Sequence, residues 1–256
     1  MLYNKSVFQY GEKKQFKPEI DQFRLVDSKK SVADFVTDTL RRAIITRTFR
    51  LDERLVESKV AAQLNVSITP VRHAFQKLAN EGLITISPYK GTCVVSITPE
   101  FIDDVCFCRN MVEITAAKYA YENLLAYDPE CLSRLIEEGI NNYNNTKQVI
   151  DVISKDCELH ETIVIHARQK TLLRFWKQLS PRIMLLQSYA KQKSFNIQQF
   201  YERHKTIAGA LAQKAGKKKF VVALQKELAL AYSAKERKII LMEANNTTEQ
   251  QLTTSP

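Results

Sequence analysis

The chain has few of the residues that interrupt regular structure, with only 6 glycines and 7 prolines in 256 residues. Leucine, alanine, lysine and glutamate are common instead, and this composition favours helices. No apolar run is long enough to span a membrane, and no secretory signal pattern occurs. We therefore expect a mainly helical protein with no membrane partner, and its length is enough for two domains with their own cores.

Cysteine pairing patterns are also missing. The five cysteines are odd in number and include no CxxC pair. Cys106 and Cys108 lie two residues apart on a predicted helix and point in different directions, which is typical of packing thiols rather than of metal ligands. A reduced, cytoplasmic compartment is the simplest interpretation.

Positive charge is in excess and is unevenly distributed. The chain carries 38 basic and 28 acidic side chains, a formal net charge of +10. Residues 1–97 hold 16 basic and 10 acidic groups, whereas the longer remainder holds 22 and 18. The excess is therefore denser in the first part of the chain, which suits a polyanionic partner there without specifying DNA.

The segment 66–78 predicts a short helix with two different faces. Apolar residues recur at helical spacing on one face, namely Val71, Ala74, Phe75 and Leu78. The opposite face carries Arg72, His73, Gln76 and Lys77. Ser67 or Thr69 can cap the helix, Pro70 is tolerated in its first turn, and Gly82 can take the left-handed conformation that follows its end.

The neighbouring segments complete a DNA-binding pattern. A shorter helix and tight turn at residues 60–66 precede the helix, and its small Ala61 and Ala62 allow close helix crossing. Apolar residues on either side of the turn at residues 87–91 predict a β-hairpin wing after it. We expect the second helix to enter the major groove, with DNA contacts from Ser67, Thr69, Arg72, His73, Gln76, Lys77, Lys90 and Gly91. The alternative is a packed helix pair with a solvated basic face.

Residues 40–96 resemble the winged helix-turn-helix domain of the GntR family of bacterial transcription regulators. The resemblance rests on residues 51–58, Val60-Ala61, residues 64–67, residues 69–72, Leu78, residues 81–83 and Gly91. Two positions depart from the family pattern, which usually has Arg in place of Ile68 and Glu in place of His73. Because an Arg in place of Ile68 commonly contacts DNA in this family, the usual operator preference of the family does not transfer directly to this chain.

After the wing, only helical patterns occur. We expect a winged helix-turn-helix at residues 31–97, of three helices and a β-hairpin, followed by an all-helical bundle of six to seven helices at residues 98–243. The expected bundle helices are 99–125, 128–145, 147–167, 170–191, 196–214 and 217–243. Residues 1–30 are expected to form a flexible arm, with or without a role in binding, and the polar tail 244–256 is expected to be disordered.

The helical part resembles the FCD domain, the ligand-sensing domain of the FadR-like branch of the GntR family. The residues that carry this resemblance are Arg109 and Glu113, residues 156–160, residues 202–205, Ile207, Ala210 and Leu211. The resemblance implies a homodimeric, effector-controlled transcription regulator. Repression released by ligand is the commoner behaviour of the family.

Asp156 and His160 are four residues apart on one helix, so they can bind one ion from the same face. His204, on another helix, could converge on them. Many FCD domains bind metal with one Asp and three His, which implies that Asp156, His160 and His204 are ligands and that Glu227 replaces the last His. Such a set suits zinc, manganese or nickel. The alternative is that the two histidines are hydrogen-bonded core residues and that Asp156 pairs with an Arg.

Arg109 is the candidate contact for a small organic-acid effector, because its guanidinium can grip a carboxylate beside the metal. The alternative for Arg109 is an ion pair with Glu113 on the same helical face. Two other functions stay open. One is a metal-dependent hydrolase with Asp156, His160, His204 and Glu227 around a catalytic water, although no nucleophile or oxyanion-hole motif supports an enzyme. The other is a metal-free sensor of acyl ligands.

Overall fold

The computed structural model describes residues 31–190, 196–231 and 233–252. The expected N-terminal arm, residues 1–30, lies outside these ranges. Within them, no helix combines the length and the apolar character that a membrane crossing requires.

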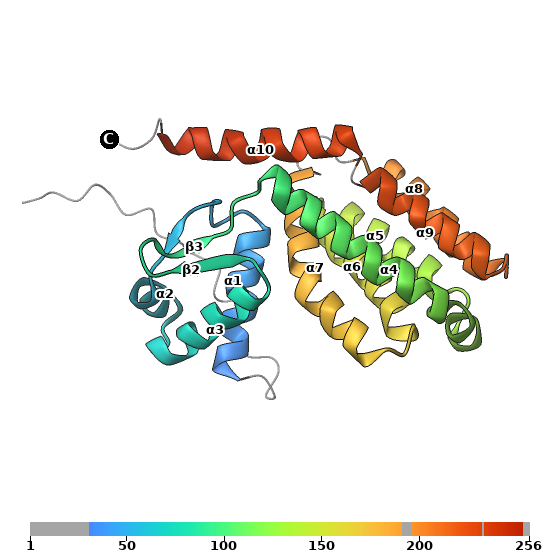
Figure 1. Ribbon diagram of the computed structural model, residues 1–256, viewed down its shortest axis with the longest axis horizontal. Coiled ribbons are helices and arrows are strands. Elements are labelled where there is room, and N and C mark those ends of the chain that lie inside the picture. The colour runs from blue at the N-terminus through green and yellow to red at the C-terminus, as the bar shows by residue number, and fades with distance from the viewer. Residues whose placement is uncertain (1–30, 191–195, 232, 253–256) are drawn as a thin grey trace, which may run out of the picture.

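The first part of the chain is a three-helix unit with a small sheet (Figure 1). Its helices are α1 (Val32–Ile45), α2 (Glu57–Leu64) and α3 (Ile68–Asn80), and its strands are β1 (Arg54–Leu55), β2 (Ile84–Ser87) and β3 (Gly91–Val94). The strands pair in the antiparallel order β1-β3-β2, with Ile84 opposite Val94 and Ser87 opposite Gly91. The predicted wing is therefore confirmed, and β1 adds an edge strand that was not predicted.

The ends of these helices follow from local chemistry. The Ser31 hydroxyl accepts a hydrogen bond from the Asp34 amide and caps α1. Asn65 takes the left-handed conformation, with φ of 51°, and turns the chain sharply between α2 and α3. The side chain of Ser67 occupies the cap position of α3 but makes no capping hydrogen bond.

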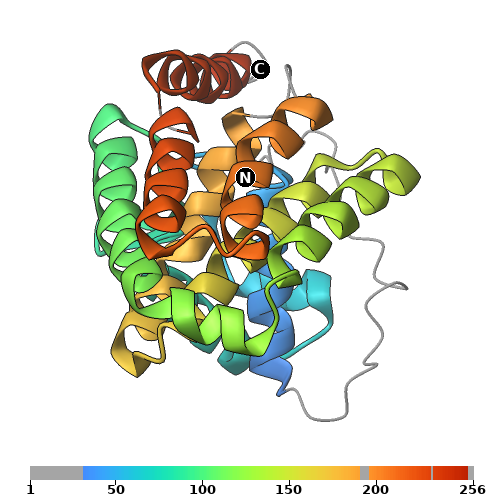
Figure 2. The ribbon, with the colours of Figure 1, turned by 90° about the vertical axis from the view of Figure 1, so that its right-hand side faces the viewer.

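Seven described helices form the second part. They are α4 (Pro99–Tyr127), α5 (Cys131–Thr146), α6 (Val149–His166), α7 (Lys170–Ala190), α8 (Ile197–Ala212), α9 (Lys217–Ala231) and α10 (Ala234–Leu252). Thr98 caps the long α4, and Pro99 occupies its first turn. Figure 2 shows α10 lying across one end of this bundle.

The C-terminal segment differs from the prediction. The helix expected at 217–243 is two helices, α9 and α10, and the expected disordered tail is helical as far as Leu252. Buried Ile240 and Ala244 anchor α10 on the bundle, and Arg237 forms an ion pair with Asp103 of α4. Once a helix is nucleated, each further residue fixes only its own backbone and adds one hydrogen bond, so the polar segment continues the helix.

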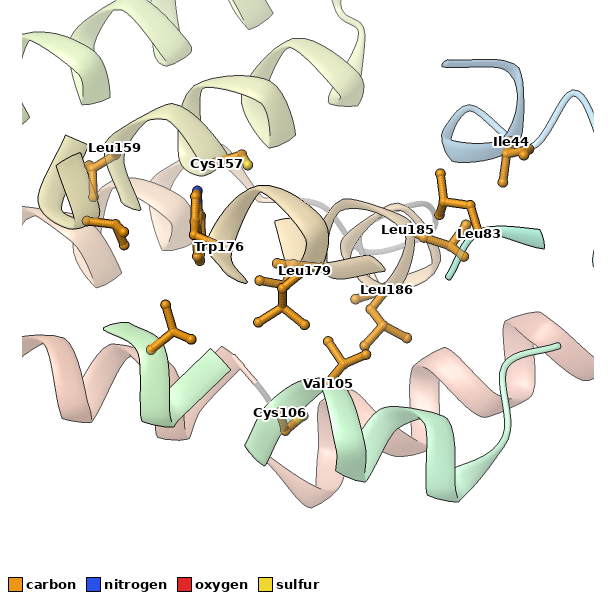
Figure 3. Packing of buried hydrophobic residues seen from close by; sticks show 14 of the residues in the cluster. Ile44, Leu83, Val105, Cys106, Cys157, Leu159, Trp176, Leu179, Leu185 and Leu186 are labelled. Atoms are coloured by element: carbon orange, nitrogen blue, oxygen red, sulfur yellow. The ribbon is translucent and has the colours of Figure 1, made fainter. Parts of the chain in front are cut away.

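The cores of the two parts are continuous through α7. Ile44 of α1 and Leu83 lie next to Leu185 of α7, and Leu186 faces Val105 of α4 (Figure 3). The guanidinium of Arg47 stacks on the ring of Tyr189 with 4.2 Å from Cζ to the ring centroid. Helix α7 therefore packs on the three-helix unit with one side and on the helical bundle with the other.

A glycine at this junction provides a test of the packing. Gly82 has φ of +69°, and a Cβ atom there would lie 2.9 Å from Cδ of Arg182 on α7. We expect Gly82→Ala to lower the free energy of unfolding by about 1–2 kcal/mol, because an L-residue is strained in this conformation. Urea denaturation measures this change.

Gly209→Ala is the matched control. Gly209 is inside α8, and the nearest atom to an added Cβ is Nε2 of Gln213 at 3.8 Å. This change should raise the free energy of unfolding by about 0.5–1 kcal/mol, because alanine loses less entropy in a helix. Equal effects of the two substitutions would contradict the assigned packing of Gly82.

Candidate functional site

The exposed face of α3 carries the side chains that were predicted to contact DNA. Val71, Ala74, Phe75 and Leu78 are buried against the rest of the unit. Ser67 is exposed just before the helix, and Thr69, Arg72, His73, Gln76 and Lys77 are exposed along it. The helix thus presents a mainly polar and basic surface to solvent, with Ile68 exposed at its start.

Two of the basic side chains on this surface are held by acidic neighbours. Arg72 pairs with Glu57 of α2 at 3.0 Å, and its side chain stays 65% exposed. Lys77 pairs with Asp34 of α1 at 2.5 Å, and this contact lowers the pKa of Asp34 to about 2. Arg72 is therefore oriented at the surface, whereas Lys77 is directed toward α1.

The wing presents a group that the sequence reasoning missed. Tyr89 is 97% exposed at the turn between β2 and β3, beside exposed Lys90. The guanidinium of Arg54 lies over Gly91, whose φ of +76° shapes the turn, and Nε of Arg54 is 3.2 Å from the position of an added Cβ. A lone aromatic residue in a predicted turn was a usable signal for Tyr89, but Arg54 required knowledge of β1.

A buried polar cluster occupies the centre of the helical bundle. Its members come from four helices: Arg109 and Glu113 from α4, Asp156 and His160 from α6, His204 from α8 and Glu227 from α9. All six are buried. With neutral imidazoles, the three carboxylates and one guanidinium have a formal charge of −2, which a buried site cannot hold without compensation.

The two histidines are oriented by hydrogen bonds on their Nδ1 atoms. The Nδ1–H of His204 donates to the backbone oxygen of Phe200 at 2.8 Å. The Nδ1 of His160 contacts the carboxylate of Glu113. Each ring therefore turns its Nε2 toward the centre of the cluster, the arrangement by which second-shell groups fix a metal-binding histidine.

The carboxylates meet these nitrogens. Nε2 of His204 lies 2.6 Å from Oδ1 of Asp156, and the amide of Gln187 donates to the other oxygen of Asp156. Glu227 places Oε2 at 3.6 Å from Nε2 of His160 and Oε1 at 3.9 Å from Nε2 of His204. The four predicted ligands are thus brought together.

This donor set fits a cation. Ligand atoms of Asp156, His160 and His204 all lie within 4.8 Å of one another. Among the described residues, Nε2 of both histidines and Oε2 of Glu227 are buried without a hydrogen-bond partner of suitable geometry. Two imidazole nitrogens and two carboxylates suit a divalent metal ion, which would also neutralise the formal charge of the cluster.

Arg109 forms the ion pair with Glu113 that was expected as the alternative to an effector contact. Its Nε lies 2.5 Å from Oε1 of Glu113, and its Nη2 lies 4.0 Å from Oε2 of Glu227. Although burial opposes ionisation of Glu113, the charges of Arg109 and His160 outweigh it and lower the pKa of Glu113. Arg109 thus stabilises the carboxylate that orients His160.

A cavity of about 190 Å³ opens beside the cluster. Its inner wall includes Asp156, His204 and Glu227, and its outer wall includes Arg203, Lys235 and Glu236. Arg203 of α8 pairs with Glu236 of α10 at 2.8 Å. Arg109 is not among the described residues that line this cavity, and the basic groups that do line it, Arg203 and Lys235, were missed because their position depends on the docking of α10.

The fold and the exposed α3 surface define a two-domain transcription regulator, with a winged helix-turn-helix joined to a separate helical domain. Residues 32–94 match the sequence model described as "Bacterial regulatory proteins, gntR family", and residues 104–218 match "FCD domain". The chain belongs to the GntR family of transcriptional regulators and carries an FCD domain.

Curated relatives agree with this assignment. The chain is 26% identical over 72% of its length to the "Probable D-xylose utilization operon transcriptional repressor" of Paenarthrobacter nicotinovorans, covering 80% of that protein. It is 23% identical over 70% of its length to the transcriptional regulator McbR of Escherichia coli, covering 81% of it. A match to YdhC of Bacillus subtilis is 24% identical over 52% of the chain and spans 59% of that relative.

Solved structures support the fold. A GntR transcriptional regulator from Rhodococcus sp. RHA1 superposes with a TM-score of 0.66 at 23% identity, over 82% of this chain and 98% of that one. Escherichia coli McbR/YncC superposes with a TM-score of 0.64 at 20% identity, over 87% of this chain and 99% of that one. The family and these relatives are regulators and not enzymes, so the hydrolase interpretation is set aside.

The contact between Glu113 and His160 predicts a pH dependence. Burial alone would lower the pKa of His160, but the carboxylate of Glu113 outweighs it and raises the pKa above the usual 6.5. In metal-free protein, NMR titration of this imidazole should therefore give a midpoint above pH 6.5. The pKa of His160 is higher in the folded than in the unfolded protein. The contact with Glu113 therefore stabilises the fold below the unfolded pKa, and this stabilisation is lost as pH rises through the folded pKa.

Glu113→Gln should move this midpoint down, since the amide no longer favours the imidazolium. Glu158→Gln is the control, because Glu158 lies on the exposed side of α6, the helix that carries His160. This variant should leave the midpoint unchanged. A wild-type midpoint below 6.5 would contradict the assigned pairing.

Proposed function

We propose that the protein is a homodimeric regulator, acting as a repressor in the bacterial cytoplasm, whose DNA binding is controlled by a metal and a small organic acid in the FCD domain. One observation carries the proposal: α7 contacts both the DNA-binding part and the buried polar cluster of the helical bundle. Gln187 of α7 hydrogen-bonds Asp156, while Tyr189, two residues along, stacks on Arg47.

On the DNA side, each protomer would place α3 in the major groove of one half-site. Thr69, Arg72, His73, Gln76 and Lys77 would supply base and phosphate contacts, and Ser67 would meet the backbone at the helix start. Lys90 and Gly91 at the wing would reach the adjacent groove edge. Repression is supported by the relative from Paenarthrobacter nicotinovorans, which is named as a transcriptional repressor.

In the helical domain, Asp156, His160, His204 and Glu227 would hold a divalent metal. A bound metal would supply positive charge that attracts the carboxylate of an effector. Glu227 in place of a nitrogen ligand makes the set harder and more anionic, which favours manganese more than an all-histidine set would, with zinc and nickel as the other candidates.

The cavity supports a small polar effector. Its volume of about 190 Å³ is that of roughly six water molecules. Lys235, together with Arg203 in its pair with Glu236, offers positive charge on the wall opposite the buried polar cluster. These features favour a small organic acid over the long apolar chain of an acyl ligand. We assign Arg109, the effector contact expected from the sequence, to holding Glu113 behind the metal ligands.

Control of DNA binding would pass through α7. An effector that moves Gln187 or Asp156 would alter the position of α7, and therefore of the Arg47–Tyr189 stack on its other side. Ligand binding would then favour one arrangement of the two DNA-binding units over another.

The DNA contacts can be tested by fluorescence anisotropy with the promoter next to the gene for this protein. We expect Arg72→Ala to weaken binding by about 1–3 kcal/mol per half-site, through loss of a base or phosphate contact. Arg134→Ala is the matched control, because Arg134 is an exposed, ion-paired arginine on α5. Unchanged binding by Arg72→Ala would show that α3 is not the recognition helix.

The same assay with and without metal measures how far metal binding in the helical domain changes DNA affinity. Tyr189→Leu should keep DNA binding and metal content but reduce the effect of metal on DNA affinity, because the contact with Arg47 is lost. An unaltered metal response in this variant would remove α7 from the proposed route.

Metal content is tested by elemental analysis of protein purified without chelator or histidine tag. We expect about one metal per chain in wild type and loss of most of it in His204→Ala, because one of four ligands is removed. His166→Ala, outside the cluster, is the control. Wild-type protein that stays empty after metal is supplied would refute the metal site and favour a metal-free effector.

A further inference from the structure

One side chain on the exposed face of α3 cannot form a hydrogen bond. Ile68 is the first residue of α3 and is 44% exposed. Arg72 and Gln76 follow it at intervals of four residues, so the three side chains lie in one row on the helix. This row contains an apolar group at the end of the helix that leads into a major groove.

The major groove offers one apolar partner for such a group. Among the four bases, only thymine presents a methyl group at its edge, whereas the other edges present hydrogen-bond donors and acceptors. Isoleucine against the edge of guanine or adenine would remove polar atoms from water without replacing their hydrogen bonds. An isoleucine at a base edge would therefore favour thymine both by attraction and by exclusion.

We propose that Ile68 contacts the C5-methyl group of a thymine in each half-site and makes that base pair a specificity determinant of the operator. This inference rests on the proposed placement of α3 in the major groove. It assigns a sequence-reading role to a residue outside the polar contact set, and Arg72 and Gln76 would read the base pairs that follow along the same row.

The test uses full-length protein and duplex DNA selected by the wild type from a random-sequence pool. Each thymine of the selected site is then replaced by deoxyuridine, which lacks only the C5-methyl group. At one thymine per half-site, we expect wild-type affinity to fall about fourfold, the change that corresponds to one buried methyl-sized group. The same replacement should not alter the affinity of Ile68→Ala, because that variant has no side chain to reach the methyl.

The matched control is Ile165→Ala. Ile165 is 47% exposed on α6, away from α3, so this variant should retain the full sensitivity to deoxyuridine. A second variant, Ile68→Arg, keeps the helix surface exposed and should select guanine in place of that thymine. This change of selected base would not follow from a general loss of stability.

The outcomes separate the two proposals. If the wild type selects a sequence but no thymine shows a sensitivity that depends on residue 68, the role of Ile68 is overturned and DNA binding stands. If Ile68→Ala selects the same thymine and keeps the sensitivity, the role of Ile68 is likewise overturned. If the wild type selects no sequence at all, both this inference and the proposed placement of α3 fail.

Discussion

The structure depends on one electrostatic constraint, the concentration of ionisable groups at the centre of the helical bundle. Three carboxylates, one guanidinium and two imidazoles from four helices share a site from which solvent is largely excluded. Most of these groups are stabilised by a fixed partner. Glu113 contacts both Arg109 and His160, and Asp156 and the backbone of Phe200 contact His204. The helices α4, α6, α8 and α9 are therefore held in register by charge as well as by apolar packing, and a divalent cation would complete the same balance.

Helix α7 gives this centre a mechanical connection to the DNA-binding unit. Its apolar residues continue the core from the bundle to α1, as Figure 3 shows, and its polar residues contact a cluster member on one side and Arg47 on the other. Close-packed interfaces of this kind move between discrete arrangements rather than deform gradually. In the proposed mechanism, a small displacement at Asp156 would thus change how α7 holds the DNA-binding unit.

Those parts of the fold and site that depend on local periodicity could be predicted from the sequence. The two faces of α3, and the position of Asp156 and His160 on one face of α6, follow from spacings of three and four residues. The convergence of His204 and Glu227 was implied only by family resemblance, since nothing local brings separate helices together. The two-residue β1 is too short for any alternation, and the extension of α10 depends on burial of Ile240 and Ala244. For Arg109 the sequence allowed two partners, an effector or Glu113, and the structure pairs it with Glu113 one turn along α4.

The position of α10 has a consequence for how such regulators diverge. The FCD match ends at residue 218, yet α10 begins at Ala234 and supplies Lys235 and Glu236 to the outer wall of the cavity. Asp156, His160 and His204 of the buried cluster lie within the FCD match, whereas the part of the cavity wall that α10 supplies lies beyond it. Substitutions in α10 would therefore change the wall of the cavity without altering Asp156, His160 and His204 or the exposed face of α3, so these surfaces can diverge at different rates.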